Sequence, residues 1–165
     1  MSGVLAYVFW HWPRPSAGRA AYEARQRSFH AALQAAPPSG FLSSFCMAVA
    51  DLPWLEPGRD AYEDWYRVES FTALETLNEG AVSGSRQSSH DAAASMSAGG
   101  MGGLYRLRAG VELERPTLAH WFGKPEGWSY AELLERLAPL VEGGGSALWV
   151  RQMVLGPGTE FCLHM

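Results

Sequence analysis

Two segments far apart in this chain end a run of aromatic and apolar residues with one basic residue directly before a proline. Residues 9–15 read FWHWPRP, and residues 119–125 read AHWFGKP. Proline ends a strand because it has no amide hydrogen to donate to the ladder. A predicted amphipathic helix with a tyrosine in its first turns follows both segments. The pattern therefore indicates that one β-α-β-β plan starts twice, which predicts an internal repeat.

The first 110 residues predict a strand, a helix, two strands, an interrupted helical segment and a fourth strand. We expect these elements at residues 3–12, 16–36, 41–50, 61–68, 70–98 and 104–108. Ser16 and Ser70 are the predicted N-caps, and Ser88 with Asp91 has the spacing of a capping box. The glycines at 99–103 predict a flexible connection before the fourth strand.

The second segment begins with a predicted strand at residues 117–122. Ser129 and Glu132 form a capping box for the next helix, and Trp128 with Leu133 is placed to act as its hydrophobic staple. Three glycines at 143–145 end that helix. A hairpin follows, with predicted strands at 147–155 and 160–165 around the turn 156–158.

The resulting fold class is α+β: a ferredoxin-like β-α-β-β-α-β unit followed by a partial second β-α-β-β repeat. With its repeated strand ends, this order resembles the dimeric α/β-barrel superfamily, which includes antibiotic-biosynthesis-monooxygenase-like, muconolactone isomerase-like and haem-binding proteins. We expect residues 1–110 to form the ferredoxin-like unit and residues 116–165 the partial repeat, packed as one globule. The resemblance implies a ligand cleft between sheet and helices, and sheet pairing within one chain or in a homodimer. It carries no catalytic motif of a specific member.

Composition and charge exclude several classes of partner. The chain has 165 residues, a formal net charge of -4 and a pI of about 5.7, which argues against nucleic-acid binding. No apolar run reaches the roughly 18 residues of a membrane span. Residues 1–12 show no signal-peptide pattern. Cys46 and Cys162 are unclustered, which is typical of free thiols in a reducing compartment, so we expect a cytoplasmic protein.

His11 and His120 are the candidate catalytic residues, because each lies near the end of the first strand of its repeat, among tryptophans. Strand alternation places His11 on one face with Tyr7 and Phe9. A histidine on such a face serves as a general base, a haem ligand or a core residue bonded to a carbonyl. His30 is interpreted as a solvated or half-buried helix residue. No metal site is expected, because no two histidines have a spacing that brings them together; haem is the one cofactor considered.

The candidate ligand-binding residues are arginines and aromatic residues of the predicted strands. Arg151 lies between Trp149 and Met153 on one strand face, where it either anchors an anionic ligand or pairs with Glu63 or Asp64. Seven tryptophans in a chain of this length favour a planar apolar ligand. The full candidate set is Arg106, Arg151, Trp10, Trp12, Trp65 and Tyr105.

Three hypotheses for the function remain open. The first is a pocket for a small apolar or aromatic molecule in a monooxygenase- or isomerase-like enzyme, with His11 or His120 as base and an arginine holding an anionic group. The second is a non-catalytic haem- or metabolite-binding module that uses the same pocket. The third is a structural homodimer without a ligand. The sequence alone leaves the substrate and the pathway unassigned.

Overall fold

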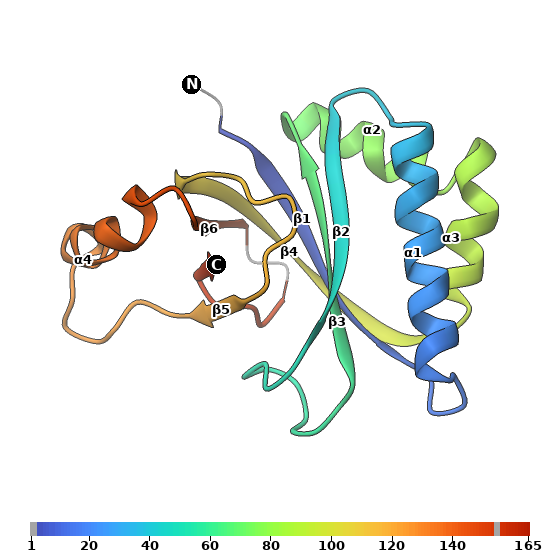
Figure 1. Cartoon of the computed structure of the whole chain (residues 1–165), viewed down its shortest axis with the longest axis horizontal. Helices are drawn as coiled ribbons and strands as arrows, with labels where there is room; N and C mark the ends of the chain where they lie inside the picture. Colours follow the sequence, from blue (N-terminus) through green and yellow to red (C-terminus); the bar gives the residue numbers. More distant parts are fainter. Residues whose placement is uncertain (1–2, 154–155) are drawn as a thin grey trace.

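The computed structural model describes residues 3–153 and 156–165. These residues contain one antiparallel sheet and the helices that cover it (Figure 1). The strands are β1 (Leu5–Pro13), β2 (Phe41–Val49), β3 (Ala61–Val68), β4 (Ser97–Gly110), β5 (Ala119–Phe122), β6 (Ala147–Met153) and β7 (Phe161–His164). The helices are α1 (Arg19–Ala35), α2 (Phe71–Ala81), α3 (Gln87–Ala94) and α4 (Tyr130–Glu142), with a 3-10 turn η1 (Gly84–Arg86) before α3.

The first four strands form the predicted ferredoxin-like unit. Their order in the sheet is β2-β3-β1-β4, and each neighbouring pair is antiparallel. Helices α1, α2 and α3 lie on one side of this sheet, as Figure 1 shows on its right. Their apolar side chains pack against alternate residues of β1 and β3, such as Leu5, Tyr66 and Val68. The predicted α+β ferredoxin-like fold is therefore confirmed.

The second segment extends the same sheet in the order β6-β7-β5. This order matches β2-β3-β1 of the first unit, because β5, α4, β6 and β7 follow one another along the chain as β1, α1, β2 and β3 do. Helix α4 packs on β6 and β7 through Leu133 and Val141. The origin of this likeness in a duplication stays a prediction. The predicted strand 147–155 is described from Ala147 to Met153, and residues 154–155 lie outside the described residues.

The sheet curls until its far end faces its beginning. Strands β3 and β5 are second and last in the strand order, yet the rings of Trp65 and Trp121 stack with centroids 5.8 Å apart. The face of the sheet that points away from α1–α3 therefore lines an inner core. That core contains the buried tryptophans Trp10, Trp65, Trp121 and Trp149, together with Tyr105, Phe45 and Cys162.

Two of the predicted helix starts are wrong. Helix α1 begins at Arg19, and its N-cap is Gly18, which has no side chain that could accept a capping hydrogen bond. The predicted cap, Ser16, lies in the turn that precedes the helix. Helix α3 follows directly from η1, so its N-cap is Arg86 and the expected Ser88 capping box does not form. The Ser70 cap and the complete capping box of Ser129 with Glu132 are confirmed. In the described residues, no helix is both long enough and apolar enough to cross a membrane.

The glycine segment predicted as a flexible connection is part of strand β4. Gly102 lies opposite Phe9 of β1 in the sheet, and a Cβ at Gly102 would lie 2.6 Å from the ring of Tyr7. The aromatic rings of β1 thus lie across β4, over positions where only a hydrogen fits. Glycine is unfavourable in an isolated strand, but here the room that it leaves for aromatic packing outweighs that cost.

We expect Gly102→Val to lower the free energy of unfolding by about 2 kcal/mol, because the new side chain displaces the Tyr7 ring. Gly123→Val is the matched control: no atom lies within 4 Å of its added Cβ. Urea denaturation of both variants and of the wild type measures the difference. Equal stability of the two variants would mean that the aromatic rings do not require the glycine.

Candidate functional site

A cavity of about 610 Å³ lies between the helix-covered face of the sheet and helices α1–α3. Strand β1 contributes Tyr7, Phe9 and His11 to its floor, since every second residue of a strand points to the same face. Phe9 stacks on both neighbours along the strand, with centroid distances of 6.3 Å to Tyr7 and 5.7 Å to His11. The helices add mainly apolar walls: Phe29, Phe71, Leu74, Leu77, Ala81 and Ala93.

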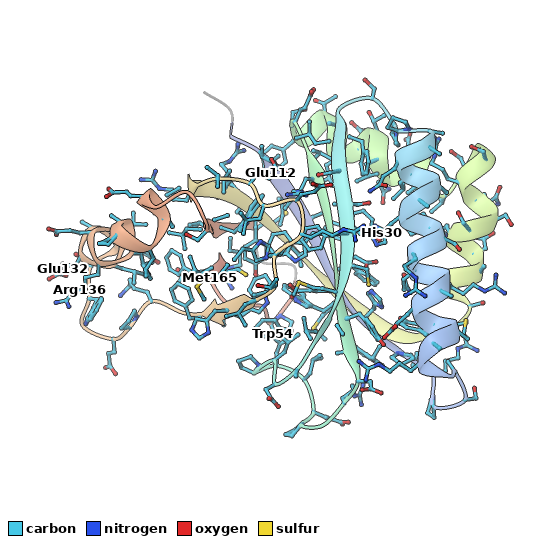
Figure 2. All side chains as sticks on the ribbon, viewed as in Figure 1. His30, Trp54, Glu112, Glu132, Arg136 and Met165 are labelled. Carbon is cyan, nitrogen blue, oxygen red and sulfur yellow. The ribbon has the colours of Figure 1, made fainter. Side chains whose placement is uncertain are left out.

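Asp64 is the buried acid of this floor. It lies on β3 opposite Phe9 of β1, so His11 is its diagonal neighbour on the same face of the sheet. The Asp64 Oδ1 atom lies 3.1 Å from Nε2 of His11 and 3.1 Å from Nε2 of His30. The hydroxyl of Tyr66 donates a hydrogen bond of 2.7 Å to Asp64 Oδ2. Figure 2 shows His30 between helix α1 and the strands of the sheet.

The two histidine–aspartate contacts have ion-pair distances but lack the alignment of a hydrogen bond. The Nε2 atoms of His11 and His30 and the Oδ1 atom of Asp64 are all buried, and none has a partner with hydrogen-bond geometry. The opposite ring nitrogens are well partnered. Nδ1 of His11 lies 2.5 Å from the Tyr22 hydroxyl, and Nδ1 of His30 lies 2.7 Å from the Ser44 hydroxyl. The Nδ1 contacts therefore orient both imidazole rings so that each Nε2 atom points toward Asp64.

Asp64 and the side chains around it, namely His11, His30, Cys46 and Tyr66, form what we call the Asp64 cluster, and its electrostatics favour a charged Asp64 carboxylate. Burial alone would raise the pKa of Asp64, but His30 and His11 outweigh it and hold that pKa well below its ordinary value. The same carboxylate acts on its other neighbours. Burial and the charge of Asp64 raise the pKa of the Cys46 thiol and of the Tyr66 hydroxyl. The cluster thus combines one anion with groups that stay protonated beside it.

A second buried acid, Glu63, lies on the opposite face of β3. It accepts three indole hydrogen bonds, from Trp65 at 2.9 Å, Trp121 at 2.9 Å and Trp10 at 3.2 Å. Burial raises the pKa of Glu63 to about 7, although the three donors act in the other direction. Glu63 belongs to the inner core and does not line the cavity.

Of the predicted catalytic residues, the structure brings His11 to the cavity floor and leaves His120 on the exposed face of β5. His120 stacks on Phe122, with ring centroids 5.6 Å apart. His30 is 6% exposed, so its interpretation as a solvated or half-buried helix residue is wrong. The reason is that α1 packs its whole inner stripe against the sheet, and His30 lies on that stripe between Phe29 and Leu33.

The predicted ligand-binding residues are spread over three environments. Trp10, Trp65 and Tyr105 lie in the inner core, on the other side of the sheet from the cavity. Trp12 lies under the Arg59 guanidinium, 5.0 Å from ring centroid to Cζ. The two arginines bind backbone: Arg106 donates to the carbonyl of Gly3, and Arg151 to that of Gly158. In the described residues, Arg151 forms no ion pair with Glu63 or Asp64.

Sequence reasoning missed most of the Asp64 cluster. His11, His30, Cys46 and Asp64 come from three strands and a helix, and only the fold brings them together. One signal was available: Glu63 and Asp64 occur side by side in a predicted strand of aromatic and apolar residues. Two acids at such positions must be buried on opposite faces, and buried acids need specific partners.

Comparisons with known proteins show a likeness of fold. No protein-family model matches the chain, and no curated protein sequence matches it. An anthrone oxidase-like protein of known structure superimposes with a TM-score of 0.57 at 11% identity, over 99% of this chain and 72% of its own. A dimeric ferredoxin-like protein of unknown function from Thermobifida fusca gives 0.49 at 11% identity, over 65% and 93% of the two chains. A similar dimeric protein from Bacteroides fragilis gives 0.46 at 12% identity, over 63% and 96%.

Proposed function

We propose that this protein binds a small, flat aromatic compound in the cavity between sheet and helices and oxidises it with the help of the Asp64 cluster. The observation that carries the proposal is the pairing of an apolar cavity with a buried acid and two histidines at its floor. An apolar pocket with a few convergent polar groups and perturbed acids is the usual form of an enzyme site.

The size of the cavity and the aromatic rings that line it support a flat ligand. Its volume of about 610 Å³ lies inside the range of roughly 300–1,000 Å³ that small-molecule sites occupy. The rings of Tyr7 and Phe9 follow one another along β1 at a stacked angle, which provides an aromatic surface for a fused-ring system, and the buried His11 ring continues the stack beside Phe9. Phe71 is 51% exposed beside the cavity and gives an apolar edge at which such a ligand enters.

The chemistry that fits the cluster is removal of a proton from an activated aromatic compound. His11 accepts the proton, and the Asp64 carboxylate 3.1 Å away stabilises the imidazolium that forms. The resulting carbanion or phenolate reacts with dioxygen without a flavin or haem. The likeness to an anthrone oxidase-like protein supports this reaction class. With anthrone as the compound, one anthrone and one dioxygen give one anthraquinone and one water.

Dioxygen consumption in the presence of anthrone tests the proposed reaction. We expect the wild type to consume dioxygen and His11→Ala to lose at least about 100-fold in rate, the usual effect of removing a general base. His120→Ala is the matched control, because His120 is an exposed histidine away from the cavity. Equal rates for His11→Ala and the wild type would refute the role of His11.

Binding is tested separately from turnover by calorimetric titration with anthrone. We expect Phe71→Ala to weaken binding by about tenfold, because the ring covers part of the ligand. Leu140→Ala removes a side chain of similar exposure, 52% against 51%, from helix α4 and should leave the affinity unchanged. If both variants bind as the wild type does, the compound lies elsewhere.

A binding module without catalysis is the second candidate, and one observation favours it. His11 is 1% exposed, so its ring reaches a ligand only from beneath the cavity surface. This candidate predicts tight binding of anthrone, or of haem, with no consumption of dioxygen. A chromophore that co-purifies with the protein would place it ahead of the enzyme.

We keep a cytoplasmic location and a homodimer as parts of the proposal. The free thiols of Cys46 and Cys162 fit a reducing compartment. In this chain Trp121 of β5 already covers Trp65 of β3, so a homodimer would use another face. Native mass spectrometry distinguishes a monomer from a dimer, and a retained ligand would appear as extra mass.

A further inference from the structure

Three side chains with metal-binding atoms meet beneath the cavity floor. One ligand atom each of His11, Cys46 and Asp64 lies within 4.8 Å of the other two. They come from the adjacent strands β1, β2 and β3, so the sheet itself fixes their spacing. His11 is 1% and Asp64 2% exposed, and in the described residues Asp64 has ion-pair contacts only with His11 and His30.

The hydrogen bonds behind His11 indicate which of its nitrogens carries the proton. Nδ1 of His11 contacts the Tyr22 hydroxyl, which lies 2.9 Å from the Ser97 hydroxyl. Ser97 in turn donates to the carbonyl of Ala93 at 3.4 Å. A carbonyl only accepts, so the chain is complete when each group donates to the next, starting from the Nδ1–H of His11. When His11 is a neutral imidazole, Nε2 then presents its lone pair to the Asp64 carboxylate; in the imidazolium, the same nitrogen carries a hydrogen.

An Nε2 lone pair and a carboxylate oxygen 3.1 Å apart in a buried site repel each other unless a proton or a metal ion lies between them. Both atoms, Nε2 of His11 and Oδ1 of Asp64, also lack a hydrogen-bond partner. A metal ion satisfies both, because it takes the lone pair of each ligand and needs no hydrogen. Metal-bound histidines usually donate their second ring N–H to an outer partner, and here the Tyr22 hydroxyl is that partner for Nδ1 of His11.

We propose that His11, Cys46 and Asp64 bind one divalent transition-metal ion, of which zinc is the best match, beneath the cavity floor. Imidazole nitrogen, carboxylate oxygen and thiolate sulfur are the three ligand types that zinc takes. The charges balance, because one thiolate and one carboxylate neutralise the ion while His11 stays neutral. Binding releases the thiol proton of Cys46 to solvent.

Two further residues position the carboxylate for this role. Tyr66 donates its hydroxyl hydrogen to Asp64 Oδ2, which leaves Oδ1 to face the ion. His30 contacts Oδ1 from the side of helix α1 and is itself oriented by the Ser44 hydroxyl. Three protein ligands leave zinc a fourth position, the arrangement of catalytic sites.

The metal site deepens the proposed function: its role in catalysis rests on that function, whereas binding of the ion does not. In the loaded protein the ion, in place of the His11 imidazole, would activate an oxygen atom of the bound compound. Metal binding is measured without any aromatic compound. The two proposals can therefore fail separately: anthrone can bind and react in a protein that binds no metal ion, and a metal ion can bind in a protein that does not oxidise anthrone.

Cobalt(II) is the probe, because its thiolate complexes absorb in the near ultraviolet. The chain is treated with a chelator, dialysed and titrated with cobalt chloride while the absorption is followed. We expect one equivalent to bind with a thiolate-to-cobalt band and to release one proton per ion. Cys46→Ser should lose the band, whereas Cys162→Ser, the matched control in the inner core, should retain it. A band that survives Cys46→Ser, or no binding at all, overturns the proposal.

Tyr22→Phe keeps the proposal testable if the ligand variants do not fold. It leaves all three ligands in place and removes only the hydroxyl that accepts from Nδ1 of His11. Loss of such an outer contact lowers metal affinity by about 10–100-fold, and we expect an effect of that size. A cobalt affinity equal to that of the wild type would show that an ion does not use His11 in this orientation.

Discussion

Glu63→Ala should lower the free energy of unfolding by about 4 kcal/mol, the largest loss that we expect from a single substitution. The change removes the only acceptor in the described residues for three buried indole N–H groups, those of Trp10, Trp65 and Trp121. Each buried donor left without a partner costs about 1–3 kcal/mol, and the lost side chain leaves a cavity in the inner core.

Chemical denaturation at pH 8 measures this loss. Glu79→Ala, an exposed acid on helix α2, is the matched control and should change stability by less than about 0.5 kcal/mol. Glu63→Gln should be intermediate. An amide offers one carbonyl oxygen for Trp10 and Trp121, but its NH₂ group then meets the N–H of Trp65. If Glu63→Ala is as stable as its control, the three indole N–H groups donate to water in the variant, and the inner core is more open to solvent than described.

The pH dependence of stability should reveal two buried groups that act in opposite directions. Burial raises the pKa of Glu63 from its ordinary 4.5 to about 7, so the native state binds more protons than the unfolded state between these values. Stability from Glu63 therefore falls as the pH rises through this window. Burial, assisted by the charge of Arg67, lowers the pKa of His164 from 6.5 to about 3, so stability from His164 rises with pH between those values.

The two slopes nearly cancel in the wild type between pH 4.5 and 6.5. His164→Phe keeps an aromatic ring beside Trp65, 4.3 Å away, and removes the titrating group. We expect this variant to lose about 3 kcal/mol of stability from pH 4.5 to 7, at about 1 kcal/mol for each pH unit. Glu63→Gln should show the opposite slope. Parallel pH profiles for the two variants would contradict the assignment of the slopes to Glu63 and His164.

The parts of the fold that the sequence predicts are those with local causes. Ser129 and Glu132 mark the start of helix α4 because a capping box needs only residues three apart. Prolines likewise mark the ends of both strands: Pro13 is the last residue of β1, and β2 ends at Val49, shortly before Pro53. The start of α1 was misplaced because Ser16 looks like a cap in sequence, while the turn that precedes Arg19 depends on the packing of the chain.

The glycine-rich start of β4 has a cause that no local pattern contains. Its glycines lie in a strand because the rings of Tyr7 and Phe9, more than 90 residues earlier in the chain, lie across them. The low strand propensity of glycine does not take into account such packing by residues distant in the sequence. The same holds for the curl of the sheet, which brings Trp121 onto Trp65 and so encloses Glu63.

Of the residues in the Asp64 cluster, sequence reasoning singled out only His11 as a candidate. The alternation of strand β1 correctly placed His11 on one face with Tyr7 and Phe9. His30 and Asp64 reach His11 through the packing of α1 on the sheet and the pairing of β3 with β1. The expectation that no metal site exists came from histidine spacing alone. That reasoning leaves out Cys46 and Asp64, which the sheet places beside His11.

A crystal structure of the protein soaked with anthrone tests the central claim most directly. We predict ring density between helices α1–α3 and the Tyr7–Phe9–His11 stack, with the oxygen of the compound directed toward the Asp64 cluster. Density for the compound on any other surface, with the cavity filled only by solvent, would contradict the claim that this cavity is the functional site.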